Sequence, residues 1–208
     1  KATLHDLIVR EIKAHKRIIF NGNGYSDEWV AEAEKRGLLN LRSTVDALPR
    51  MIEEKNIRLF TSHKVFSATE IYARYEIKLE EYVKVLNIEA ETALVMAQRE
   101  ILPAMMRYTG DMARHAASLK ELSLPTGAED ELLPKLCADV DLLHKNIEEL
   151  KRVMAVERPE DALAAATYEH DTVIPAMNAV RAVADELETM VDEKFWPFPT
   201  YGDLLFRV

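Results

Sequence analysis

The chain has 208 residues, of which 48% are hydrophobic and 30% charged, with a net charge of −9. This composition provides a sizeable core and excludes a disordered tract. Because nucleic-acid binding requires a basic face, and because no run of about 18 apolar residues could cross a membrane, we expect neither partner. Glycine is absent between Gly37 and Gly110, which favours a mostly helical protein.

The cysteine content indicates the cellular location of the chain, and the first residues indicate whether it is part of a longer protein. The single cysteine, Cys137, excludes an internal disulfide and is typical of a reducing, cytoplasmic location. It directly follows Leu136, a position that we expect to face neighbouring helices, so we interpret Cys137 as a small apolar residue that fills space in the core. The chain begins with Lys1 in a helical pattern, without a signal peptide, which indicates part of a longer protein.

The first residues predict short helices. An apolar stripe predicts a helix from Leu4 to Ile19, and the Asn-Gly pairs at residues 21–24 predict a tight turn. Ser26 is expected to cap a helix that continues through Arg36, with Gly37 at its C-terminal end.

A second short helix is expected from Ser43 or Thr44 to Lys55. The pattern at residues 57–60 leaves an extended segment and a loop both open. We group residues 1–66 as one segment of short helices and loops.

A long helix is predicted after residue 66. The sequence Ser67-Ala68-Thr69-Glu70 is a capping-box signature. The apolar stripe that follows has an 11-residue repeat, which suits a nearly straight helix to about Leu122, kinked at Pro103. Its members are Ile71, Tyr75, Leu79, Tyr82, Leu86, Ala90, Ala93, Ala97 and Ile101.

Two further long helices are expected, one from Glu129 to about Val156 and one from near Glu160. Their apolar residues recur every three or four positions, which is typical of helices packed side by side. The fold class is therefore all-α: short N-terminal helices, then an antiparallel bundle of about three long helices over residues 67–194. The stripe residues are Leu136, Val140, Leu143, Ile147, Leu150 and Met154, then Leu163, Ala166, His170, Val173, Met177, Val180, Ala184, Leu187 and Val191.

Two features of these helices need a separate interpretation. We interpret His170 as a buried polar seam residue that fixes register, with a ligand or base as the less favoured alternative. The sequence at residues 101–105, Ile-Leu-Pro-Ala-Met, recurs at residues 173–177 as Val-Ile-Pro-Ala-Met. Matched prolines that kink two neighbouring helices and a coincidental likeness both stay open.

The C-terminal segment, residues 195–208, is expected to be a non-helical tail because Pro197 and Pro199 interrupt helical hydrogen bonding. Five of the fifteen aromatic residues fall within it. An apolar tail of this kind must pack on its own core or on a neighbouring surface. The candidate docking residues are Phe195, Trp196, Phe198, Tyr201 and Phe206.

No pattern in the chain indicates an active site. The Asn-Gly pairs lack the third glycine of a dinucleotide fingerprint, and no phosphate-loop motif is present. The six histidines form no metal-binding pair at helical spacing, and the paired carboxylates suit solvated faces. We therefore assign no catalytic, cofactor-binding or metal-binding residue.

Three stretches carry a resemblance to a known family. They are residues 17–29, Arg-Ile-Ile-Phe-Asn-Gly-Asn-Gly-Tyr-Ser-Asp-Glu-Trp, continuing to the Ser-Thr-Val-Asp-Ala-Leu-Pro of residues 43–49; residues 66–76, Phe-Ser-Ala-Thr-Glu-Ile-Tyr-Ala-Arg-Tyr-Glu; and residues 196–206, Trp-Pro-Phe-Pro-Thr-Tyr-Gly-Asp-Leu-Leu-Phe. In this order the chain resembles the C-terminal region of type III glutamine synthetases.

The resemblance implies a parent enzyme that joins ammonia to glutamate with ATP, through a γ-glutamyl phosphate and Mg²⁺ or Mn²⁺. The family's metal- and substrate-binding motifs precede the matched region, so none is carried over, and the chain alone is not expected to be an enzyme. The resemblance also implies a double-ring homo-oligomer, with the catalytic domain of the same chain and neighbouring subunits as partners.

Three hypotheses follow for the chain itself. The first is a helical assembly module of a glutamate–ammonia ligase. The second is a regulatory module that binds an effector or a protein within its bundle. The third, without the family, is a generic helical scaffold.

Overall fold

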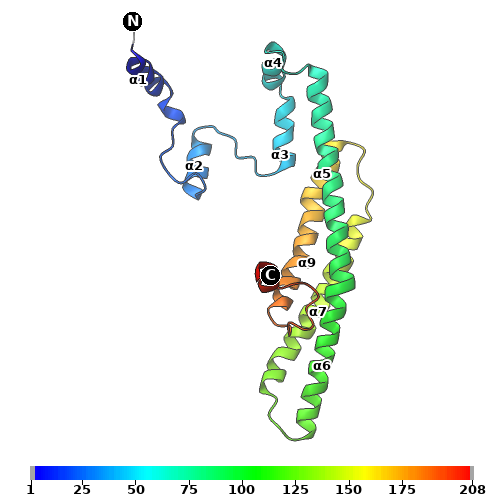
Figure 1. Ribbon diagram of the computed structural model, residues 1–208. Coiled ribbons are helices and arrows are strands. Elements are labelled where there is room, and N and C mark those ends of the chain that lie inside the picture. Colours follow the sequence, from blue (N-terminus) through cyan, green and yellow to red (C-terminus); the bar gives the residue numbers. More distant parts are fainter. Residues whose placement is uncertain (1–2, 207–208) are drawn as a thin grey trace. The chain divides into compact units, whose positions relative to one another are not determined.

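A computed structural model describes residues 3–206 of the chain, which divides into two compact units, residues 1–47 and residues 48–208. Every regular element within residues 3–206 is a helix or helical turn, and no strand occurs there (Figure 1). The predicted all-α class is therefore confirmed.

The first unit contains short helices with conventional caps. Ser26 Oγ accepts a hydrogen bond from the Trp29 N–H at 3.4 Å, and Gly37 closes the same helix with φ 75°. This confirms the predicted capping residues. The helices are α1 (Leu4–His15), α2 (Asp27–Lys35) and α3 (Thr44–Ala47).

Arg36 organises the loop between α1 and α2. Its guanidinium carbon lies 5.9 Å from the ring centroids of Phe20 and Trp29, which are 4.5 Å from one another. The same side chain pairs with Glu32 at 2.6 Å and donates to the Arg17 carbonyl at 2.7 Å. These contacts hold the predicted Asn-Gly turn against α2.

The second short helix differs from the prediction. Instead of one helix to Lys55, α3 ends at Ala47, and a 3₁₀ turn (Leu48–Ile52) precedes α4 (Glu54–Ser62). Pro49 lies in this turn and cannot donate a helical hydrogen bond, which accounts for the interruption. Residues 57–60 are consequently helical rather than extended or loop.

The predicted long helix is confirmed in the second unit. Helix α5 (Ala68–Met96), a π turn (Ala97–Ile101) and α6 (Leu102–Glu121) form one continuous helix of 54 residues. At its start Ser67 and Glu70 form the expected capping box, with the Ser67 N–H donating to Glu70 Oε2 at 2.7 Å.

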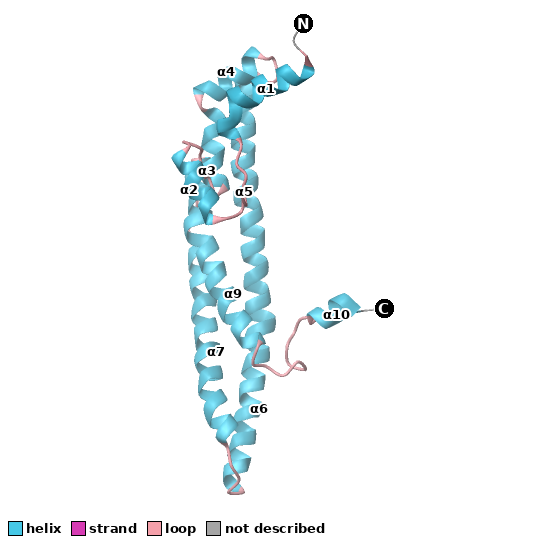
Figure 2. Ribbon diagram, turned by 90° about the vertical axis from the view of Figure 1, so that its left-hand side faces the viewer, coloured by secondary structure: helices cyan, strands magenta, loops and turns pink. Residues whose placement is uncertain are grey.

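The remaining helices return along this long helix. Helix α7 packs against both α6 and α9, and α8 packs against α5, so the bundle is antiparallel (Figures 1 and 2). The bounds are α7 (Gly127–Met154), α8 (Ala162–Tyr168), a π turn (Glu169–Val173), α9 (Ile174–Glu188) and α10 (Tyr201–Phe206).

The two π turns explain the recurring proline sequence. Pro103 and Pro175 each occupy the first turn of an α-helix that follows a five-residue π turn. The Leu102 N–H donates to the Ala97 carbonyl and the Ile174 N–H to the Glu169 carbonyl, five residues back. The two recurrences therefore share one local structure, while a kink of both helices at the prolines stays a prediction.

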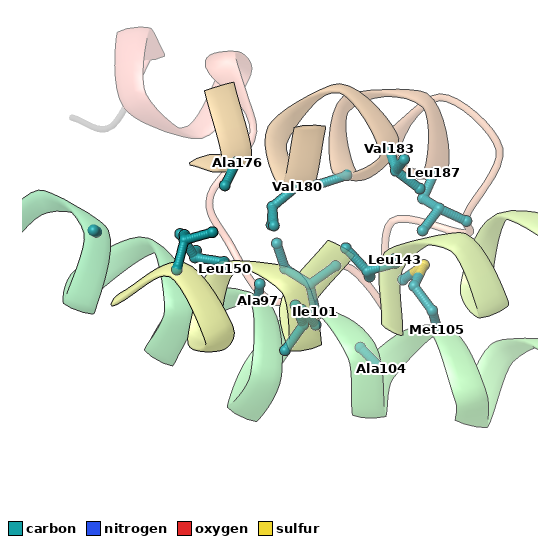
Figure 3. Close-up of a cluster of buried hydrophobic side chains, with 14 of the residues drawn as sticks. Ala97, Ile101, Ala104, Met105, Leu143, Leu150, Ala176, Val180, Val183 and Leu187 are labelled. Carbon is teal, nitrogen blue, oxygen red and sulfur yellow. The ribbon is translucent and has the colours of Figure 1, made fainter. Parts of the chain in front are cut away.

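The core follows the predicted seams. Residues such as Leu79, Leu143 and Leu187 are fully buried, and side chains from the first π turn, α6, α7 and α9 interleave (Figure 3). The central cluster includes Ala97, Ile101, Ala104, Met105, Leu136, Leu143, Ile147, Leu150, Val173, Val180, Ala184 and Leu187. No helix among residues 3–206 is both long and apolar enough to span a bilayer.

The tail is only partly as predicted. Residues 195–200, which contain both prolines, are outside any helix, but residues 201–206 form α10. Thr200 caps it, since Thr200 Oγ1 accepts from the Asp203 N–H at 3.2 Å and Asp203 Oδ2 accepts from the Thr200 N–H at 3.0 Å. The prediction of a wholly non-helical tail is wrong because its prolines lie upstream of this cap.

Two adjacent leucines test the seam. Leu143 is fully buried, whereas Leu142 is 44% exposed. We expect Leu143→Ala to lower the free energy of unfolding by about 2–5 kcal/mol, because it leaves a cavity between helices. Leu142→Ala should cost less than about 1 kcal/mol. Urea unfolding followed by circular dichroism measures both, and equal effects would contradict the assigned seam.

Candidate functional site

A buried ion pair lies where α5, α7 and α8 meet. Glu169, the first residue of the second π turn, is 0% exposed and pairs with the Arg158 guanidinium. Asn87 on α5 donates to Glu169 Oε1 at 3.3 Å, and Arg158 Nη2 donates to Asn87 Oδ1 at 3.3 Å. The three side chains form a closed hydrogen-bonded cycle, here called the Arg158 cluster.

Arg158 also completes the C-terminal end of α7. Its Nη1 donates to the carbonyls of Val153 and Met154, both at 3.4 Å. Its guanidinium carbon lies 4.7 Å from the centroid of the Tyr168 ring, and the Tyr168 hydroxyl donates to the Val153 carbonyl at 3.0 Å. One arginine thus satisfies carbonyls that a helix end leaves without intrahelical partners.

The electrostatics of the Arg158 cluster indicate a structural role. Burial, followed by the nearby Glu169 carboxylate, raises the pKa of the Tyr82 hydroxyl. Glu169 Oε2 has no hydrogen-bond partner, while Oε1 accepts from both Arg158 and Asn87. The Glu169 carboxylate is buried and its Oε1 is occupied by arginine and asparagine, an arrangement that joins three segments of the bundle.

The sequence pattern does not predict this cluster, and it places the buried polar residue one position too late. His170 is not buried: its side chain is 39% exposed, and Nδ1 lies 2.7 Å from Asp171 Oδ1. Ala166, Glu169 and Val173 are all buried, so the buried face advances here by three residues and then by four, whereas the predicted stripe advances by four and then by three. Glu169 occupies the buried position instead.

A groove lies between α5 and α9 and is the second candidate site. Its volume is about 460 Å³. The floor includes Ala97 and Ile101 of the first π turn and Val180 of α9, seen together in Figure 3. Trp196 and Phe198 of the tail cover one side. Because these residues are distant in sequence, the groove exists only in the folded bundle.

The predicted docking residues of the tail separate into two sets. Phe195 lies 5.4 Å from the Tyr108 ring, and Trp196 and Phe198 pack against the core of the bundle. Phe206 is 78% exposed on α10, and the side chain of Tyr201 lies outside the described residues. The structure brings three of the five against their own bundle.

The histidine, cysteine and carboxylate side chains considered above do not come together in a site within the described residues. Within residues 3–206 no three His, Cys, Asp or Glu side chains come close enough to hold a metal ion. Cys137 is exposed rather than packed as an apolar filler, because it lies one position beyond the buried Leu136. The absence of catalytic residues from the chain stays a prediction.

The geometry defines an all-helical module. It is a long antiparallel bundle that contains a buried ion pair and a groove, and the C-terminal tail of the same chain covers one side of the groove. Residues 3–120 match the model of the glutamine synthetase C-terminal domain. The chain belongs to this family, which confirms the resemblance.

Curated relatives extend the match. The chain is 37% identical to a glutamine synthetase of Butyrivibrio fibrisolvens over 100% of its own length and 30% of the relative's. It is 36% identical to a type-3 glutamine synthetase of Dictyostelium discoideum, covering 92% of this chain and 27% of the relative. A glutamine synthetase of Bacteroides fragilis is 26% identical over 96% of this chain and 28% of the relative. The chain therefore spans less than a third of these relatives.

The Arg158 cluster can be tested against an exposed pair. We expect Arg158→Ala to lower the free energy of unfolding by about 3–5 kcal/mol, since it leaves the Glu169 carboxylate buried without a counter-charge. Arg152→Ala removes an exposed pair with Glu149 and should cost at most about 1 kcal/mol. Chemical denaturation of both variants measures the difference.

A second substitution separates the charge from the packing. Adding Glu169→Leu to Arg158→Ala should recover part of the lost stability, because no unpaired charge then remains in the core. If the double variant were no more stable than Arg158→Ala, the buried charge would not be the cause.

Proposed function

We propose that the chain is a helical assembly module of a glutamate–ammonia ligase, an enzyme that makes glutamine from glutamate, ammonia and ATP in the cytoplasm. The observation that carries this proposal is family membership over a chain that spans under a third of its relatives. In this proposal the catalytic residues lie in the catalytic domain, upstream of the region matched here.

The cofactors of the proposed enzyme are ATP and Mg²⁺ or Mn²⁺. The described residues of this chain do not suit those metals, because their acidic and histidine side chains form no cluster. Glu169, the one fully buried carboxylate among the described residues, is already paired with arginine. We therefore derive no catalytic step from this chain.

Two exposed apolar surfaces support an assembly role. Helix α1 has no buried residue, and its apolar side chains, including Leu7 and Ile12, are exposed. Helix α10 exposes Leu204, Leu205 and Phe206 in succession. Surfaces of this kind mark contacts with other protein. The proposed partners are the catalytic domain of the same chain and neighbouring subunits of a double-ring homo-oligomer.

A regulatory module is the second candidate function. The observation that favours it is the groove, because a cavity of about 460 Å³ at the junction of two helices and the tail has the size of a small-molecule site. The two functions are compatible, since one module can both assemble and bind an effector.

Deletion in the full-length enzyme tests the assembly role. We expect replacement of residues 67–194 by a short flexible linker to disrupt the oligomer, because it removes the whole bundle. Sedimentation velocity beside the intact enzyme measures the change, with Leu142→Ala as a folded control. A variant that still sediments as the intact oligomer would refute the role.

The absence of catalysis is tested on the 208-residue chain. We expect no ATP-dependent formation of γ-glutamyl hydroxamate from glutamate and hydroxylamine, with full-length enzyme as the positive control. Product formed above the rate of the reaction without protein would show that the chain holds an active site.

A further inference from the structure

We propose that the groove between α5 and α9 is a binding site for a small molecule with an apolar, preferably aromatic, body and one protonated amine. This inference goes beyond assembly and does not depend on the parent enzyme's reaction. It is carried by three properties of the groove: its shape, its aromatic side and its charge.

Small residues on two facing helices create the space. Ala93 and Ala97 on the long helix and Ala184 on α9 line the groove where larger side chains would close it. Met96 and Met177 complete the lining with flexible, polarisable side chains that adapt to a ligand. The result is a groove with an apolar floor.

The floor also contains an irregular piece of helix. Ala97 and Ile101 are the first and last residues of the π turn that precedes Pro103. Single π turns within α-helices occur frequently at functional sites. The irregularity therefore coincides with the cavity rather than with an arbitrary part of the bundle.

Aromatic side chains form one side of the groove. The rings of Trp196 and Phe198 meet edge to face, with centroids 6.0 Å apart, and Pro199 continues the same surface. This arrangement presents flat apolar surface to a ligand. An aromatic or alkyl body gains from contact with such rings beyond the area it buries.

The rim carries an unbalanced negative charge. Arg181 and Asp185 line the groove and pair with one another, Nε to Oδ2 at 3.3 Å. Glu188, one turn further along α9, also lines the groove and forms no hydrogen bond or ion pair with any described side chain. An unpaired carboxylate beside an apolar groove favours a cation, so the ligand class is an amine rather than an acid.

Two matched probes, phenylbutylamine and phenylbutyrate, share an apolar body and differ in charge. The experiment follows both tryptophan indole N–H signals of the 208-residue chain by NMR during titration. We expect the amine to shift the Trp196 signal, with a dissociation constant on the order of 1 mM, and to leave Trp29 unchanged. The acid should bind more weakly.

Three variants identify the site. Glu188→Gln should weaken amine binding about two- to fivefold and strengthen acid binding by a similar factor, as expected for one exposed charge. Ala93→Leu should abolish binding of both probes by filling the floor. Ala117→Leu, at an exposed alanine of α6, is the matched control and should change neither.

The proposal is overturned by any of four results. The acid binds as tightly as the amine; Trp29 shifts instead of Trp196; Ala93→Leu retains binding; or the amine produces no saturable shift. Because Glu188 is exposed, Glu188→Gln keeps the fold and remains informative even if Ala93→Leu is destabilised.

Discussion

Burial of one apolar seam is the constraint on which the second unit depends. A single helix is held in water mainly by packing of its apolar face rather than by its own propensity. The 54-residue helix obtains that packing from α7 and α9, which interleave Leu143 and Leu187 with Met105 (Figure 3). The ion pair, the groove and the attachment of the tail all rely on this shared core.

The two π turns are where the seam becomes irregular, and each coincides with a polar or open feature. One, at residues 97–101, contributes to the floor of the groove. The other places Glu169 in the core, where an unpaired carboxylate would be costly. Arg158 provides the counter-charge from the connection between α7 and α8, so the break in the chain also stabilises the helices that it joins.

Periodicity predicted the seam well because a heptad pattern repeated over many turns leaves few alternatives. The prediction failed where the order of three- and four-residue steps was ambiguous and where a helix was short. A three-residue step taken as a four-residue step exchanged His170 for Glu169, and a helix as short as α4 offers too few turns for its period to be read. The prolines of the tail obscured the cap at Thr200 that begins α10.

The groove was beyond prediction for a different reason, since it depends on alanines from two helices and aromatics from a third segment. Its position links it to α10, because Leu204, which is exposed like Leu205 and Phe206 of the same helix, lines the groove. A partner that moved α10 would therefore change the edge of the groove at Leu204. Such a coupling would be reciprocal, because a ligand in the groove would change the affinity for that partner by the same factor by which the partner changed the affinity for the ligand.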